Sequence, residues 1–218
     1  MKKYFKAGLL IVTLVIPALI FTFLRFFATN HYNIPYYYPL KDASGNVVIS
    51  KNDTVFYRVQ DLNIRTLNDS NFPAHPFKDK LTVIHNLSGK CKDDSCQLVL
   101  SNLERIYNLR EKIKPLNILT IRDSISNAVI QTPAFISKKG WIVSKVTPAE
   151  YANVFDKTLK FQTKVPGAKT NSIKSKLMLI DNNEHIRGYY NGSDPEEINR
   201  LMAEIKILNL ENGLSSRH

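Results

Sequence analysis

Residues 81–121 read LTVIHNLSGKCKDDSCQLVLSNLERIYNLREKIKPLNILTI. The stretch opens on an apolar run at 81–87 and closes on another at 116–121, and both runs are typical of buried strands. The residues between them predict a helix from about 97 to 113, which Pro115 ends. Strand, helix and strand in this order predict parallel pairing through a right-handed crossover. The helical spacing is carried by Val99, Leu103, Ile106 and Ile113.

The C-terminal part of the chain predicts an antiparallel hairpin followed by a helix. KLMLID at 176–181 and HIRGYY at 185–190 flank the turn residues NNE. The sequence Ser193-Asp194-Pro195-Glu196 resembles a capping box with proline and starts a helix that runs to about residue 210. One face of this helix is apolar and is expected to pack on the core; it carries Ile198, Leu201, Met202, Ile205 and Leu208.

These elements together predict one α/β domain. TPAE at 147–150 is a second capping box that starts a helix, and 54–64 indicate a further strand. A βαβ half followed by a hairpin and a C-terminal helix is the pattern of the thioredoxin-like fold. That fold has its redox cysteines after the first strand, at the helix N-terminus, and the chain has its two cysteines at this position.

The first 28 residues predict an uncleaved membrane anchor. Lys2, Lys3 and Lys6 precede 18 uncharged residues, and the next charge is Arg25. A run of this length just spans the hydrocarbon core. The run ends in bulky residues, FTFLRFFATN, which lack the small residues of a signal-peptidase site. The predicted fold class is therefore thioredoxin-like α/β with an N-terminal transmembrane helix.

The lysines before the apolar run place the N-terminus in the cytoplasm, because positive charge is retained on that side. We therefore expect a single-pass protein of the cytoplasmic (inner) membrane whose C-terminal domain faces the periplasm or the outside. Tyr36, Tyr37 and Tyr38 lie in the predicted stalk, where they suit either the headgroup layer or packing on the domain. The predicted parts are a cytoplasmic segment 1–6, an anchor 7–28, a stalk 29–52, a domain 53–211 and a tail 212–218.

The formal net charge is +11, and four of the positive charges belong to the anchor region, which leaves +7 for the rest of the chain. A basic surplus often indicates nucleic acid, but a domain beyond the membrane meets little of it. We therefore expect no nucleic-acid partner. The lipid bilayer with its anionic headgroups, or an acidic envelope protein, is a better counterpart, and a basic surface that only keeps the domain soluble ranks above both.

The chain resembles the bacterial Sco/SenC family, membrane-anchored thioredoxin-fold proteins that help deliver copper to cytochrome oxidase. The resemblance rests on NHYNIP after the anchor, on LTVIHNLSGKCKDDSC, on LNILTI, on the single Trp141 and on the ending LMLIDNNEHIRGYYNGSDPEEINRLMAEIKIL. It implies a thioredoxin-like domain that binds respiratory oxidase subunits or other envelope proteins.

The predicted site departs from the family pattern, which has three residues between its cysteines, prolines after them and a histidine before the hairpin. Here four residues separate Cys91 from Cys96, and residues 168–177 contain no histidine. Copper held by two thiolates needs a third soft or imidazole ligand. His85 is the candidate replacement, although a histidine on a strand is more often a packing residue.

Three interpretations of Cys91 and Cys96 stay open. A structural disulfide or inert pair ranks first, because an oxidising compartment and a flexible loop suffice for it. A dithiol redox pair ranks second, since thioredoxin-type catalysts use two intervening residues. A copper(I) site with His85 ranks third. We expect no cofactor under the first interpretation. An enzymatic activity, if there is one, would be thiol–disulfide exchange.

We predict that the full-length chain is an integral membrane protein with its C-terminus outside. A C-terminal reporter that is active only in the periplasm should be active, and alkaline extraction should leave the chain in the membrane fraction. Activity of a cytoplasm-only reporter, or release of the full-length chain, would contradict the prediction.

Overall fold

The computed structural model describes residues 12–23, 33–62, 64–66, 72–87, 94–123, 138–161 and 176–215. The chain divides into two compact units, Met1–Asn33 and Ile34–His218, and each is described by itself. Residues 12–23 of the first unit are helical. None of the helices within the described ranges combines the length and apolar character needed to cross a bilayer. The predicted anchor 7–28 extends past residues 12–23 on both sides, outside the described residues, and stays a prediction.

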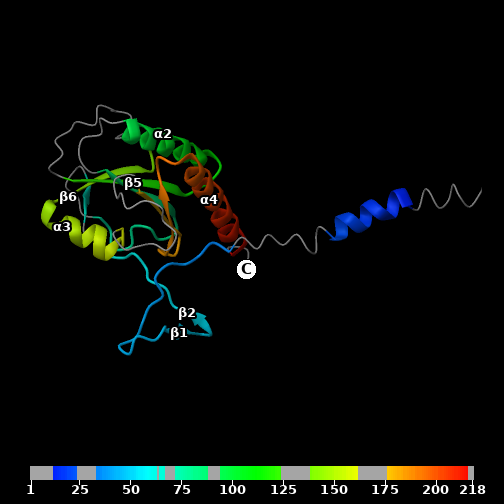
Figure 1. Cartoon of the computed structure of the whole chain (residues 1–218), viewed down its shortest axis with the longest axis horizontal. Helices are drawn as coiled ribbons and strands as arrows, with labels where there is room; N and C mark the ends of the chain where they lie inside the picture. The colour runs from blue at the N-terminus through cyan, green and yellow to red at the C-terminus, as the bar shows by residue number, and fades with distance from the viewer. Residues whose placement is uncertain are drawn as a thin grey trace, which may run out of the picture. The chain divides into compact units, whose positions relative to one another are not determined.

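The second unit is a mixed α/β domain with a six-stranded sheet in the order β3-β6-β5-β4-β7-β8 (Figure 1). A separate two-stranded sheet is formed by β1 and β2. The elements are β1 Ile49–Ser50, β2 Asp53–Thr54, β3 Arg65–Thr66, β4 Leu81–Leu87, α2 Asp94–Asn108, η1 Leu109–Glu111, β5 Leu116–Asp123, β6 Trp141–Val146, α3 Pro148–Ala152, η2 Asn153–Thr158, β7 Lys176–Ile180, β8 Ile186–Asn191 and α4 Pro195–Ser215.

The strand pairing confirms the predicted βαβ unit and hairpin. β4 and β5 pair in parallel, with His85 opposite Thr120, and α2 is the crossover between them. β7 pairs antiparallel with both β4 and β8, so the hairpin closes the sheet beside the central strand. Parallel strands require such a crossover, and the helix covers the apolar side chains of one sheet face.

The core lies on both faces of the sheet. On one face, Val83 and Ile118 pack in a cluster with residues of α2 and α4. On the other face, Ile84 and Ile121 pack with Phe155, which follows α3. Successive strand side chains point to opposite faces, so β4 supplies both clusters in alternation. The apolar face predicted for the last helix is confirmed, because Ile198, Leu201, Ile205 and Leu208 of α4 are buried and Met202 packs against the same cluster.

The helix boundaries differ somewhat from the predicted ones. α2 begins at Asp94, three residues before the predicted start, and ends at Asn108, where the 3-10 turn η1 follows. The capping box at Thr147 is confirmed, since its side chain accepts from the Glu150 backbone and the Glu150 carboxylate accepts in return. For α4 the cap is Asp194, whose Oδ1 accepts from the Glu196 backbone N–H at 2.9 Å.

The strand predicted at 54–64 does not form as a continuous ladder. Apart from Thr54, which belongs to β2, the pairing of its described residues consists of isolated bridges, such as Arg58 with His185. The apolar side chains Val59 and Leu62 are nevertheless buried, at 0% and 3% exposure. Their spacing therefore reflected burial against the domain rather than sheet pairing. β6, which pairs with β5 in parallel, was not predicted.

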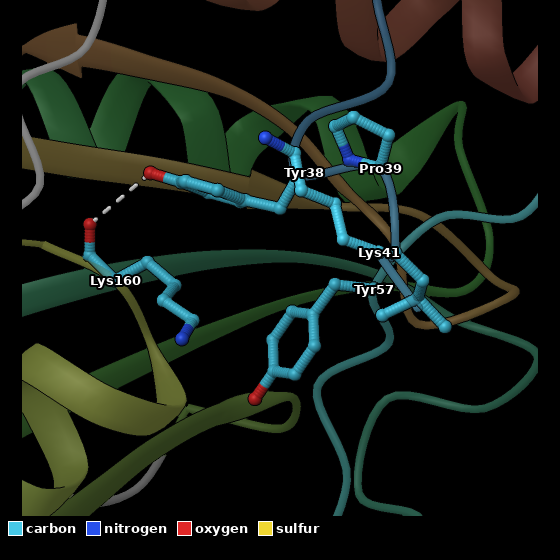
Figure 2. A pocket seen from close by; sticks show the side chains of 6 residues that line it. Tyr38, Pro39, Lys41, Tyr57 and Lys160 are labelled. Atoms are coloured by element: carbon cyan, nitrogen blue, oxygen red, sulfur yellow. Dashed lines mark hydrogen bonds between the residues drawn. The ribbon is translucent and has the colours of Figure 1, made fainter. Parts of the chain in front are cut away.

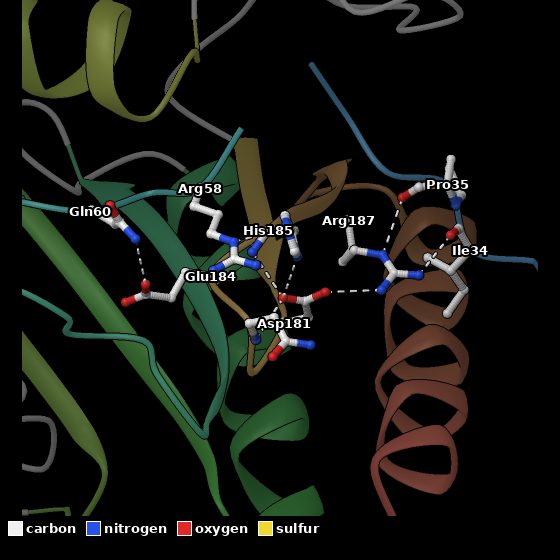
Figure 3. A network of polar contacts seen from close by, with 9 residues as sticks. Ile34, Pro35, Arg58, Gln60, Asp181, Glu184, His185 and Arg187 are labelled. Atoms are coloured by element: carbon white, nitrogen blue, oxygen red, sulfur yellow. Dashed lines mark hydrogen bonds and ion pairs between the residues drawn. The ribbon is translucent and has the colours of Figure 1, made fainter. Parts of the chain in front are cut away.

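Arg187 of the hairpin binds the backbone of Ile34 and Pro35 and also forms a buried ion pair with Asp181 (Figure 3). Arg187 contacts the Asp181 carboxylate at 3.0 Å, and it also donates to the Ile34 carbonyl at 2.7 Å and to the Pro35 carbonyl at 3.3 Å. Burial acts to raise the pKa of Asp181, but the contacts with His185 and Arg187 outweigh it and lower that pKa. The compact unit thus begins within the predicted stalk.

The three tyrosines whose location the sequence left open pack on the domain. The Arg187 guanidinium lies over the Tyr36 ring, 3.8 Å from its centroid. Tyr37 meets Tyr189 edge-on, and the Tyr189 hydroxyl donates to that of Tyr38 at 3.2 Å. The N-terminal segment is therefore bound to the domain through its side chains as well as through its backbone.

We predict that Arg187→Met lowers the free energy of unfolding by roughly 3–5 kcal/mol, because it leaves the buried Asp181 carboxylate without its partner. Urea unfolding of the full chain in neutral detergent measures the effect. Glu104→Ala is the matched control. It removes the exposed ion pair with Lys138 and should cost roughly 0–1 kcal/mol. Equal losses in the two variants would contradict the larger contribution to stability that we assign to the buried ion pair.

Candidate functional site

The candidate site lies at the carboxyl ends of the parallel strands, where α2 begins. Cys96 is in the first turn of α2 and is disulfide-bonded. Cys91 is the other cysteine of the sequence and lies, with 88–93, outside the described residues. The predicted location of the cysteines, after the first βαβ strand and at the helix start, is thus met for Cys96.

Cys96 is half-buried and packs against the cluster formed by α2, α4 and the sheet. A sulfur in the first turn of a helix is close to the positive end of the helix dipole, which stabilises a thiolate once the disulfide is reduced. The exposed carboxylate of Asp94, two residues earlier, acts in the opposite direction. The helix start thus favours a thiolate at Cys96, and the Asp94 carboxylate opposes it.

His85 is a fully enclosed side chain, 1% exposed, on β4. It shares its sheet face with Val83, two residues before it, and therefore lies on the side that α2 covers. Burial lowers the pKa of His85 to about 4, so the imidazole is neutral at pH 7. Among the described residues its Nδ1 has no hydrogen-bond partner, so this atom does not link His85 to Cys96. Neutral imidazole is the form that binds metals, but the surroundings are those of a packing residue.

Sequence reasoning missed a row of buried polar side chains beside His85. Trp141 Nε1 donates to Thr120 Oγ1 at 3.1 Å, next to His85 across the β4–β5 ladder. On the opposite face, Asn86 Nδ2 donates to the Tyr151 hydroxyl at 2.8 Å. The sequence feature that could have revealed them is a polar residue within an apolar strand, as in LNILTI and LTVIHNL. Ligands commonly bind at the carboxyl ends of the strands in an α/β sheet, where these residues lie.

The donor set for copper(I), taken as a cargo rather than a resident cofactor, does not fit the oxidised state described here. A disulfide sulfur is not a thiolate, and thiolates are the ligands that copper(I) prefers. Within the described residues, no three His, Cys, Asp or Glu side chains are grouped so that they could hold a metal ion. The loop before the hairpin, which supplies a histidine in the family pattern, falls in 162–175, outside the described residues.

We predict that His85 makes stability depend on pH between about 6.5 and 4. The unfolded chain binds the imidazole proton more readily, so stability is full above the unfolded pKa of 6.5 and falls as pH drops toward 4. From pH 7 to pH 5 the folded state should lose about 2 kcal/mol through this group. Urea unfolding of His85→Leu should lack this loss, whereas His75→Gln, at an exposed histidine, should keep it. An unchanged pH dependence in His85→Leu would contradict the prediction.

No protein-family model matches the sequence, and a search of curated proteins finds no match. Solved structures do match. BsSco, described as a member of the Sco family of cytochrome c oxidase assembly proteins, is 14% identical with a TM-score of 0.55, over 71% of this chain and 94% of that one. A SCO1/SenC family lipoprotein from Bacillus anthracis str. Ames is 14% identical with a TM-score of 0.51, over 69% and 95%. The predicted resemblance is confirmed at the level of the fold: this chain has the thioredoxin-like fold of Sco/SenC proteins.

Proposed function

We propose that this chain is a membrane-anchored, Sco/SenC-like protein that assists respiratory cytochrome oxidase assembly or envelope redox homeostasis, mainly by binding partner proteins. The observation that carries the proposal is a disulfide-bonded cysteine in the first turn of α2 on a fold shared with Sco/SenC proteins. The partners in this proposal are oxidase subunits or other envelope proteins. BsSco is itself described as belonging to a family of oxidase assembly proteins.

The proposed location is the cytoplasmic membrane, with residues 7–28 as a single span and the domain facing the periplasm or the outside. Two independent features support it. The lysines before the apolar run favour a cytoplasmic N-terminus. Disulfides such as that of Cys96 persist in oxidising compartments, which the outer side of this membrane provides.

The metal site in this proposal is degenerate. Four residues separate Cys91 from Cys96, and the chain lacks a histidine in 168–177. His85 is the remaining imidazole candidate, and its ring lies in the core beneath α2. Two sulfurs without a third soft ligand bind copper(I) weakly. The domain is therefore proposed to act through its surface and not as a carrier of the metal.

A second function, thiol–disulfide exchange or copper(I) delivery through Cys91 and Cys96, is favoured by one observation. The helix start that holds Cys96 is where a thiolate is stabilised. In an exchange step, a partner dithiol would attack the disulfide through a mixed disulfide. The partner would leave oxidised, and Cys91 and Cys96 would leave reduced, each with one proton. The reduction potential separates the two functions, since structural disulfides lie below about −300 mV and exchange catalysts between about −270 and −120 mV.

We predict that alkylation of unreduced envelope preparations finds no free thiol at Cys91 or Cys96. The reduction potential of the disulfide should lie in the range of structural disulfides.

Reduced full-length protein in neutral detergent should lose copper(I) to a strong chelator. In cells, Cys91→Ser/Cys96→Ser should retain cytochrome oxidase activity, while deletion of the chain should lower it.

The opposite results are equally specific. Copper(I) held at one per chain against the chelator, and lost in Cys91→Ser, would establish a working metal site, and His85→Leu would then test the third ligand. A potential in the catalytic range, with loss of oxidase activity in the double variant, would establish the exchange function. Unchanged oxidase activity after deletion of the chain would contradict the assembly role.

A further inference from the structure

A small open cavity lies between the segment that precedes β1 and the turn that follows η2 (Figure 2). Its volume is about 270 Å³. Sites for drug-sized ligands begin at roughly 300 Å³, so this cavity suits a headgroup-sized molecule better than a cofactor. The lining residues are Tyr38, Pro39, Leu40, Lys41, Tyr57 and Lys160.

The walls are the ring faces of two tyrosines whose hydroxyls are already engaged. Tyr38 donates to the Lys160 carbonyl at 3.4 Å, and Tyr57 donates to the Thr158 carbonyl at 3.1 Å. Figure 2 shows the Tyr38 hydroxyl directed at that Lys160 carbonyl. The hydroxyl groups hold the rings in place, and the rings present apolar surface to the cavity together with the adjoining proline and leucine.

The charged lining residues are both lysines. Lys160 extends toward the Tyr57 ring, with Nζ 5.2 Å from the ring centroid (Figure 2). Within the described part of the chain, neither Lys41 nor Lys160 forms an ion pair. The acid nearest to Lys41 in sequence, Asp42, accepts from the Ser44 and Asn46 backbone N–H groups, both at 2.9 Å. The cavity therefore combines positive charge with apolar walls, which complements an anion that carries an apolar portion.

Two of the lining residues have a backbone conformation that side chains of their size rarely adopt. Tyr38 has φ 60° and Lys160 has φ 55°, both in the left-handed region. The hydrogen bond between them joins these two positions across 122 residues of sequence. Non-glycine residues in this region concentrate at ligand clamps and functional loops, where surrounding contacts hold them. The hydrogen bond therefore fixes the backbone at two residues that line the cavity.

We propose that this pocket binds the phosphate-bearing headgroup of an anionic phospholipid, with Lys41 and Lys160 on the phosphate and the tyrosine rings on the glycerol and upper acyl carbons. The inference rests on the proposed anchor. Tyr38 lies ten positions after residue 28, the end of the predicted span, and an extended chain of that length reaches at most about 35 Å. The bilayer surface is therefore the anion source within reach of the pocket, and its negative potential attracts lysines.

The test uses the full chain with ¹³C-labelled tyrosine rings in phosphatidylcholine nanodiscs that contain increasing shares of phosphatidylglycerol. We expect saturable shifts of the Tyr38 and Tyr57 ring signals. Lys41→Ser/Lys160→Ser should need roughly tenfold more phosphatidylglycerol for half-saturation. The control Lys112→Ser/Lys206→Ser removes the same charge from exposed positions outside the pocket and should respond as the unchanged chain does. Single variants Lys41→Gln and Lys160→Gln serve if the double variant does not fold.

Each other outcome overturns the proposal. Absence of a ring shift in the unchanged chain would show that the lipid does not bind in the pocket. Equal responses of the pocket and control variants would show that diffuse surface charge, and not the pocket, attracts the lipid. The same shifts from inorganic phosphate in pure phosphatidylcholine discs would assign the pocket to a free anion. A chain that inserts into the discs without a lipid-dependent shift contradicts the pocket alone, whereas a chain that does not insert contradicts the anchor and the lipid assignment with it.

Discussion

The central strand β4 is the constraint on which the rest of the domain depends. All seven of its residues are buried, because it pairs on one edge with β5 and on the other with β7, and both of its faces are covered. Parallel pairing with β5 requires a crossover, and α2 fulfils that requirement while burying one face of the sheet. The start of α2 is thereby fixed beside the carboxyl end of β4. Cys96 occupies the site predicted for it because of this geometry, and not because of the cysteines themselves.

Burial of a whole strand also decides what its polar side chains can do. Asn86 finds a partner in Tyr151, and Thr120 on the neighbouring strand accepts from Trp141. The fully buried His85 becomes a neutral base with a pKa near 4. These groups lie near the carboxyl ends of β4 and β5, next to the helix start that carries Cys96. The chemistry of this end of the sheet therefore depends on core packing as well as on the cysteines.

The opposite end of the sheet has a different role. There the Asp181–Arg187 ion pair uses its remaining donors on the Ile34 and Pro35 carbonyls, so the hairpin holds the chain where it enters the domain. The residues that follow, Tyr38 to Lys41, then form one wall of the cavity near Lys160. One continuous segment is thus anchored by a buried charge pair and presents a basic, aromatic pocket a few residues later. In the proposed topology, this segment is also the first part of the domain after the membrane anchor.

The sequence by itself determined the elements whose signals are local. The strands at 81–87 and 116–121, the hairpin, and the helices with their caps follow from apolar periodicity and from capping residues within a few positions of each other. The tertiary structure decided what depends on distant partners. Only packing shows that Val59, Leu62 and Ile64 are buried although their segment forms no continuous ladder, and that the Arg187 guanidinium meets a carbonyl 153 residues away. The cavity wall at Lys160 lies 122 residues from Tyr38 in sequence. Periodicity records how much of a side chain is buried, but not which segment covers it, because that choice depends on contacts between residues that no local pattern links.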